Sequence, residues 1–196
     1  IDARMMGAMA TRGIGRVVTN LVRAWKDYAP EDELVILSGQ EPPVPGVHWI
    51  KAHAPWYGFQ EQTTWLWWLY RASKNTDWTI FPHWNVPVLY FKRYAVFLHD
   101  LILLNQPFSQ KTSTRWFVWG WIKFQVFRCT LVWALWRAKI VFVPTRYVQE
   151  DAIRHFAFLK HKLVLVGEGI DVGHDEEPVP DLPERFLLYV GSAYPH

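Results

Sequence analysis

Apolar residues recur with a helical period near the start of the chain. Between Gly13 and Pro30 they stand three or four positions apart, so that they fall on one face of a helix. This spacing predicts an amphipathic helix over 13–28. The residues of its apolar face are Ile14, Val17, Val18, Leu21, Val22 and Trp25.

Short apolar runs alternate with further helical patterns along the rest of the chain. Such runs, bounded by Gly, Pro and polar residues, predict buried strands. Alternating strands and helices predict an α/β fold, a Rossmann-like, doubly wound and mainly parallel sheet. The predicted strands are 1–4, 34–37, 48–51, 78–81, 94–98, 140–143 and 163–166, and the further predicted helices are 60–73, 110–138 and 145–158.

The loops that follow the strands are the expected place for a ligand. In doubly wound sheets the binding crevice lies beyond the carboxyl ends of the strands. We therefore expect the loops 5–12, 82–87 and 99–107 to share one edge of the sheet.

An acidic, proline-rich segment divides the chain near its end. Residues 167–185 read as a linker after a first domain over 1–166, and an apolar run then begins at Phe186. We expect 186–196 to hold the first strand of a second domain.

The amino-acid composition is that of a globular protein. With 51% hydrophobic and 20% charged residues among 196, the chain is a globular protein with a substantial core. The single cysteine, Cys129, forms no internal disulfide and fits a reducing compartment. The opening residues lack a basic region leading into an apolar stretch, so no secretory signal is expected.

Charge is unevenly distributed. Residues 101–149 contain seven Lys or Arg and no acid, which leaves 21 − 7 = 14 cations against 18 acids elsewhere. Together with thirteen tryptophans, this pattern suggests an anionic partner, either a membrane or a nucleic acid. Because the remainder is acidic, a long phosphate track is disfavoured. The sequence favours an anionic membrane surface and no nucleic acid.

The helix predicted over 110–138 has two contrasting sides. A helical wheel places an arc of aromatic and aliphatic residues toward the core, from Trp116 to Ala138. Cations in the middle of the segment disfavour a membrane-spanning helix, whereas cations beside indoles suit an interfacial one. A contact with a second domain or another subunit is the alternative. The predicted membrane surface consists of Arg115, Trp119, Lys123, Arg128, Trp133, Trp136 and Arg137.

Three short motifs are candidates for chemistry. Gly13 and Gly15 begin a helix, where bare backbone can approach a phosphate, although a tight turn explains them equally well. A dinucleotide fingerprint needs a third glycine where Val18 stands, which weakens a nicotinamide-dependent oxidoreductase as an interpretation.

Two further motifs follow predicted strands. His99 and Asp100 follow one strand, and His83, Trp84 and Asn85 follow another. For both motifs, the alternatives are a contact with a sugar and ordinary capping or loop packing.

Four segments in order resemble the acceptor-binding half of family 4 glycosyltransferases, which have the GT-B fold of two Rossmann-like domains. These segments are IDARMMG with TRGIGRVVTNLVRAW, AVFLHDLILLNQP, AKIVFVPTRYVQEDAIRHF with KLVLVGEGID, and FLLYVGSAYPH. The chain departs from the usual pattern at Thr145, where serine is common, and at Glu168, where asparagine is usual.

The resemblance implies retaining transfer of a sugar from a nucleotide-sugar to a lipid-linked or cell-envelope glycan, without a metal ion or other cofactor. Gly13 and Gly15 match the donor-diphosphate loop, and His99 matches the histidine between donor sugar and acceptor hydroxyl. The donor domain would follow the present chain. We expect a cytoplasmic protein, peripheral at the inner face of the membrane; the alternative is a non-catalytic glycan- or membrane-binding module. The expected acceptor-binding residues are His83, Trp84, Asn85 and Asp100.

Overall fold

The computed structural model describes most of the first 167 residues. The described residues are 1–6, 13–55, 58–106, 117–167, 169, 183 and 185–187, and of Phe117 and Val118 only the backbone is described. The linker predicted over 167–185 and the strand predicted from Phe186 lie largely outside these ranges. The predicted domain boundaries therefore stay predictions.

The order of helices and strands follows the predicted alternation. In chain order they are α1 (Gly13–Tyr28), β1 (Val35–Ser38), β2 (His48–Lys51), the 3-10 turn η1 (Phe59–Glu61), α2 (Thr64–Ala72), β3 (Thr79–Phe81), β4 (Tyr94–Phe97), α3 (Ile102–Asn105), α4 (Phe117–Arg137), β5 (Ile140–Val143), α5 (Arg146–His155), the 3-10 turn η3 (Ala157–His161) and β6 (Leu163–Leu165).

Three predicted elements differ from the structure. The helix predicted over 60–73 is a 3-10 turn followed by α2, and the helix predicted over 145–158 ends at His155. Thr145 is the N-cap of α5, with its Oγ1 accepting from the Val148 N–H at 3.2 Å. The short helix α3 lies in a segment predicted as loop, because four residues are too few to show a periodic pattern.

The strands form a parallel sheet. Strand β1 pairs with β2, and β3, β4, β5 and β6 pair in that order, all parallel. Residues 1–3 join the two groups, because the Ala3 N–H donates to Leu37 O at 2.8 Å and the Asp2 N–H donates to Ile80 O at 3.0 Å. The predicted strand 1–4 is thus a single bridge, and the predicted α/β fold with a parallel sheet is confirmed.

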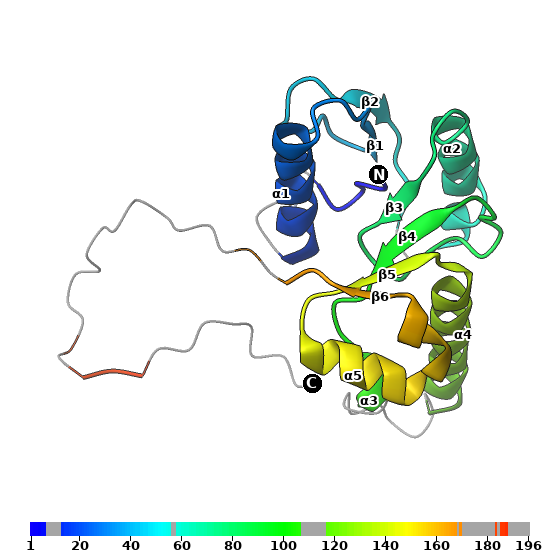
Figure 1. Cartoon of the computed structure of the whole chain (residues 1–196). Helices are drawn as coiled ribbons and strands as arrows, with labels where there is room; N and C mark the ends of the chain where they lie inside the picture. Colours follow the sequence, from blue (N-terminus) through cyan, green and yellow to red (C-terminus); the bar gives the residue numbers. More distant parts are fainter. Residues whose placement is uncertain are drawn as a thin grey trace.

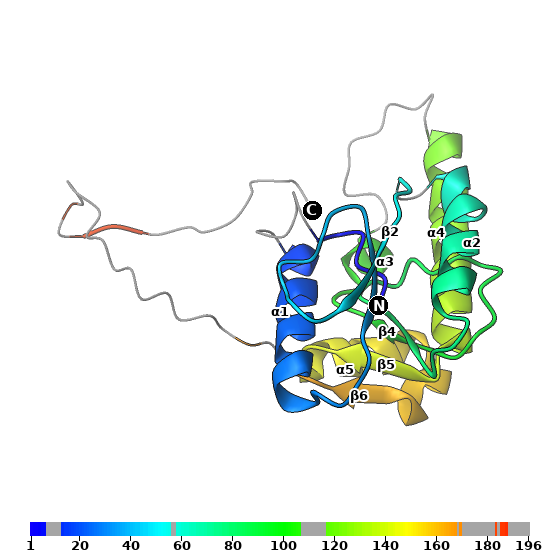
Figure 2. The ribbon, with the colours of Figure 1, turned by 90° about the horizontal axis from the view of Figure 1, so that it is seen from above.

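Helices cover both faces of the sheet. Figures 1 and 2 show α1 on one side and α2 with α4 on the other. On the first side, Val18 and Val22 of α1 pack against Ile36 of β1. The larger core lies on the other side and joins α2, α4 and α5 to the strands. Its buried helical residues are Trp65, Leu69, Leu131, Ala134, Leu135, Val148 and Ala152.

Helix α4 buries the arc that its periodicity predicts. Leu131, Ala134 and Leu135 are fully buried, and the Tyr94 hydroxyl donates to Ala134 O at 2.7 Å. On the opposite side, Trp119 and Trp136 are exposed. Within the described ranges, no helix combines the length and apolar character needed to cross a bilayer.

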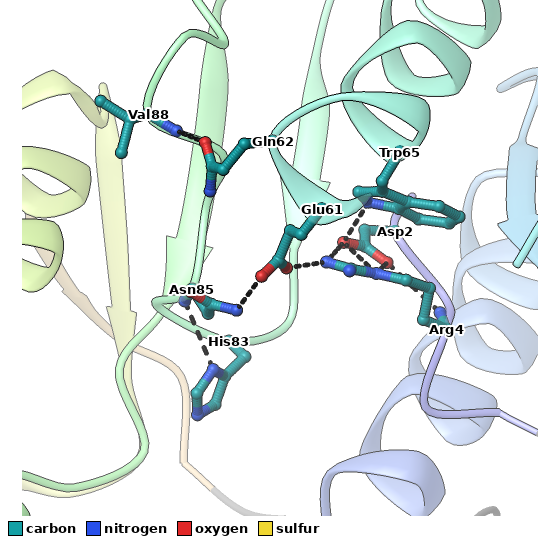
Figure 3. A network of polar contacts seen from close by, with 8 residues as sticks. All are labelled: Asp2, Arg4, Glu61, Gln62, Trp65, His83, Asn85 and Val88. Carbon is teal, nitrogen blue, oxygen red and sulfur yellow. Dashed lines mark hydrogen bonds and ion pairs between the residues drawn. The ribbon is translucent and has the colours of Figure 1, made fainter. Parts of the chain in front are cut away.

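A buried ionic cluster ties the start of the chain to the segment before α2 (Figure 3). The Arg4 guanidinium is 2.8 Å from Asp2 Oδ2 and 2.8 Å from Glu61 Oε1, and its side chain is 2% exposed. The Trp65 indole donates to Asp2 Oδ2 at 3.3 Å, and the Asn85 amide donates to Glu61 Oε2 at 2.7 Å. Burial lowers the pKa of Arg4, but the two carboxylates offset this and leave the pKa raised. We define these five residues as the Arg4 cluster.

The Arg4 cluster should be a major source of stability. Arg4→Met keeps much of the side-chain volume but leaves two buried carboxylates without their shared cation. We expect a loss of about 3–5 kcal/mol in the free energy of unfolding, measured by urea denaturation. The matched control Arg23→Met, on the exposed side of α1, should change it by less than about 0.5 kcal/mol. Equal effects of the two variants would show that the cluster contributes little.

Candidate functional site

The sheet order places a crevice between residues 1–3 and β3. From residues 1–3 the sheet continues to β1 and β2 in one direction and to β3 through β6 in the other. Open α/β sheets bind ligands at such a reversal, beyond the carboxyl ends of the strands. A cavity of about 250 Å³ lies at this edge. Its lining residues are Ile14, His83, Trp84, His99, Asp100, Ile102 and Leu103.

His99 lies at the cavity just after β4 and is oriented by the neighbouring loop. Its Nε2 is 2.9 Å from Pro82 O. Because a carbonyl oxygen only accepts, Nε2 carries the proton and Nδ1 keeps its lone pair when the ring is neutral. The ring also stacks on Phe97 at an interplanar angle of 19°. His99 therefore offers a hydrogen-bond acceptor on a ring of fixed orientation.

His83 is the second imidazole of the cavity. Its Nδ1 accepts from the Asn85 backbone N–H at 3.3 Å, so the neutral ring carries its proton on Nε2 (Figure 3). Burial, with a smaller contribution from His99 nearby, lowers the pKa of His83 to about 4. His83 is thus uncharged at neutral pH.

The other predicted acceptor residues have different positions. Trp84 lines the cavity, is buried and packs its ring edge-on against Phe127. Asp100 also lines the cavity and is exposed, and its Oδ1 accepts from the Ile102 N–H at 3.0 Å. Asn85 does not line the cavity; its side chain is buried in the Arg4 cluster, and its backbone N–H donates to His83 Nδ1.

The two glycines flank Ile14, which reaches the cavity. Gly13 has φ +40°, a backbone conformation that favours glycine, and a Cβ there would meet no atom within 4 Å. This supports the tight-turn interpretation for Gly13. Gly15 is buried, and its carbonyl accepts from Thr19 Oγ1 at 2.9 Å. The loop 7–12 lies outside the described residues, so the predicted role of both glycines toward a diphosphate stays a prediction.

Only part of the predicted membrane surface is exposed to solvent. Lys123 and Arg128 are exposed on α4 together with Trp119 and Trp136. Trp133 and Arg137 instead bond to a neighbouring loop: the indole donates to Val88 O at 2.8 Å and the guanidinium to Phe91 O at 3.0 Å. Arg115 lies outside the described residues.

The Arg4 cluster and three apolar residues of the cavity wall, Ile14, Ile102 and Leu103, were not predicted as parts of the site. Asp2 and Arg4 stand in a segment predicted as a strand. Charges in a buried strand need polar partners, so these two residues were a signal of such partners. Glu61 gave no such signal, because it is one of several polar residues before α2. Ile102 and Leu103 reach the cavity from α3, which was not predicted.

The cavity suits an uncharged, hydroxyl-bearing ligand. Two imidazoles and one carboxylate stand beside apolar side chains, a common arrangement for ligands with polar groups on an apolar body. His99 Nδ1 can accept a hydroxyl proton in a hydrogen bond. In the described part of the chain, no group of three or more His, Cys, Asp or Glu is placed to hold a metal ion.

Comparison with known proteins gives no family. No protein-family model matches the chain, and a search of the curated proteins finds no match either.

The lowered pKa of His83 predicts a specific pH dependence of stability. The unfolded chain takes up a proton near pH 6.5, whereas the folded protein does so only near pH 4. His83 therefore contributes fully to the free energy of unfolding above pH 6.5. This contribution is lost as pH falls toward 4, and it amounts to on the order of 3 kcal/mol at most. Urea unfolding should be followed across this pH range for the wild type and for His83→Gln. As pH falls, the free energy of unfolding of the wild type should decrease relative to that of His83→Gln.

The exposed residue His48 provides the control, because His48→Gln should not alter the pH profile in this way. Nitrogen chemical shifts of the imidazoles should also show the Nε2–H tautomer at both His83 and His99. A wild-type profile parallel to that of His83→Gln would contradict the assignment.

Proposed function

We propose that this chain is the acceptor-binding domain of a retaining glycosyltransferase of the GT-B type. The nucleotide-sugar would supply the transferred sugar, and a lipid-linked or cell-envelope glycan would supply the accepting hydroxyl. The observation that carries the proposal is the cavity beyond the carboxyl ends of the strands, where His99, His83 and Asp100 meet. A Rossmann-like sheet order and the resemblance of four segments support it.

In this proposal His99 positions the acceptor. A sugar hydroxyl would hydrogen-bond to Nδ1, while the bond from Nε2 to Pro82 O keeps the ring from turning away. His83 stays neutral at neutral pH, so it contributes hydrogen bonding without placing a positive charge beside His99. The nucleotide and the donor sugar would bind mainly to a second domain that follows Phe186.

We expect His99→Ala to lower turnover by about 10²-fold or more, the effect of losing a positioned polar or acid–base group. The assay is release of nucleoside diphosphate from a panel of nucleotide-sugars, using the complete protein with lipid extracts as acceptor. His48→Ala, at an exposed strand position, is the matched control and should keep full activity. Near wild-type turnover in His99→Ala would contradict its role. Glycan binding without any diphosphate release would identify a non-catalytic module.

We also propose that α4 contacts an anionic membrane. The helix exposes Trp119, 60% exposed, and Trp136, 54% exposed, and also the cations Lys123 and Arg128. Indoles favour the depth of the lipid headgroups. Each nearby cation adds about 1 kcal/mol of attraction to an anionic leaflet. A lipid-linked acceptor would be reached from such a position.

We expect the protein to co-sediment with vesicles that contain phosphatidylglycerol and not with vesicles of phosphatidylcholine alone, and less so as salt rises. The double change Lys123→Glu and Arg128→Glu should reduce binding strongly, because it reverses the charge of two exposed cations of α4. Arg23→Glu with Lys51→Glu makes the same change of net charge elsewhere on the surface and should leave binding nearly intact. Equal binding to neutral vesicles, or none at low salt, would reject the membrane contact.

A further inference from the structure

The loop between β3 and β4 presents apolar side chains at its tip. Leu89 is 55% exposed and Phe91 is 53% exposed, with Val88 beside them. Tyr90, between these two, points the other way into the core and contacts Phe81 with ring centroids 5.4 Å apart. The loop is therefore anchored by one aromatic residue while its neighbours face outward.

The backbone of this loop is bonded within the protein. Six of the eight N–H and C=O groups of residues 88–91 have protein partners, and five of these six bonds come from side chains of α2, α4 or the turn before α2. The bonds are Gln62 Oε1 with the Val88 N–H, Pro87 O with the Tyr90 N–H, the Tyr70 hydroxyl with both the Phe91 N–H and Leu89 O, Trp133 Nε1 with Val88 O, and Arg137 Nη2 with Phe91 O. We call residues 87–91 the clamped loop.

Such hydrogen bonding suits a loop that is transferred from water into a bilayer. A loop tip in solution can satisfy its backbone with water, but where acyl chains exclude water an unbonded N–H or C=O is costly. Here side chains from distant parts of the chain take the place of water, and the apolar side chains remain outside. A surface loop that stays in water needs neither feature.

The residues beside the clamped loop select the occupant. Arg137 bonds to the loop, and Lys92 and Arg93 follow it directly in the sequence. On α4, the exposed residues Trp119, Ile122 and Val126 precede Trp133 and Arg137 at spacings of three, four and seven, so they lie on the side of the helix that holds the loop. An apolar tip beside cations and indoles matches an anionic bilayer better than a protein surface.

We propose that the clamped loop inserts Leu89 and Phe91 between the headgroups of an anionic bilayer, and that Trp133 and Arg137 hold it in shape for insertion. The inference rests on the proposed membrane contact of α4 and adds the segment that enters the lipid. Charge on α4 brings the surface to the membrane, and the loop supplies the apolar contact.

Insertion can be measured with a fluorophore at position 89. Leu89→Cys in a Cys129→Ser background carries a polarity-sensitive label, and Tyr28→Cys in the same background is the control, since Tyr28 lies at the exposed end of α1. With vesicles of phosphatidylglycerol and phosphatidylcholine, the label at 89 should shift to the blue and be quenched by nitroxides on the acyl chains. The label at 28 should do neither.

Unlabelled variants separate insertion from attraction. Leu89→Ser with Phe91→Ser should weaken vesicle binding by about tenfold while the dependence on salt stays. Both side chains are more than half exposed, so the thermal midpoint should not change. Trp133→Phe removes the donor to Val88 O and should reduce the quenching at position 89 more than Trp136→Phe, which makes the same change at an exposed indole of the same helix.

The outcomes are distinguishable. If the protein binds anionic vesicles while the label at 89 stays in water, the insertion is wrong and the membrane contact of α4 stands. If the protein binds no vesicles at low salt, both fail. If Leu89→Ser with Phe91→Ser instead abolishes a concentration-dependent dimer seen by light scattering, the loop contacts a second copy and the lipid assignment is overturned.

Discussion

The pairing of Arg4 with Asp2 and Glu61 is the interaction on which the rest of the structure depends. Residues 1–3 join the two groups of strands, and only one bridge and a few backbone bonds hold them there. Arg4 follows directly and connects this short segment to Glu61 before α2. A buried guanidinium with two carboxylates is stable only when all three are present, since removing one leaves charge without compensation. The cluster thereby links residues 1–3, where the sheet reverses its order, to the turn before α2.

The candidate site takes its geometry from that cluster. Glu61 accepts from the Asn85 side chain, and the Asn85 backbone donates to His83 (Figure 3). The loop after β3 in turn receives the bond from His99 at Pro82 O. Two imidazoles from different strand ends are thus held by a continuous set of hydrogen bonds that begins at a buried ion pair. A ligand entering the cavity meets groups that are already oriented, which lowers the entropic cost of binding.

Helix α4 connects the core to the surface proposed to contact lipid. Its inner side carries Leu131, Ala134 and Leu135 against the strands, and Trp84 of the cavity wall packs on Phe127 of the same helix. Its outer side holds the clamped loop through Trp133 and Arg137. In the proposed function, one rigid helix therefore fixes the distance between the acceptor cavity and the membrane.

The sequence by itself determined most of the helices and strands, because amphipathic period and β-branched runs are local properties. It also indicated His83, Trp84, His99 and Asp100, since residues that follow parallel strands must meet at one edge. Only the tertiary structure decided that Asn85 belongs to a buried cluster and that Trp133 and Arg137 bond to a loop up to 46 positions away. The physical reason is that such bonds depend on which elements the fold brings side by side, and a periodic pattern carries no information about a partner distant in the chain.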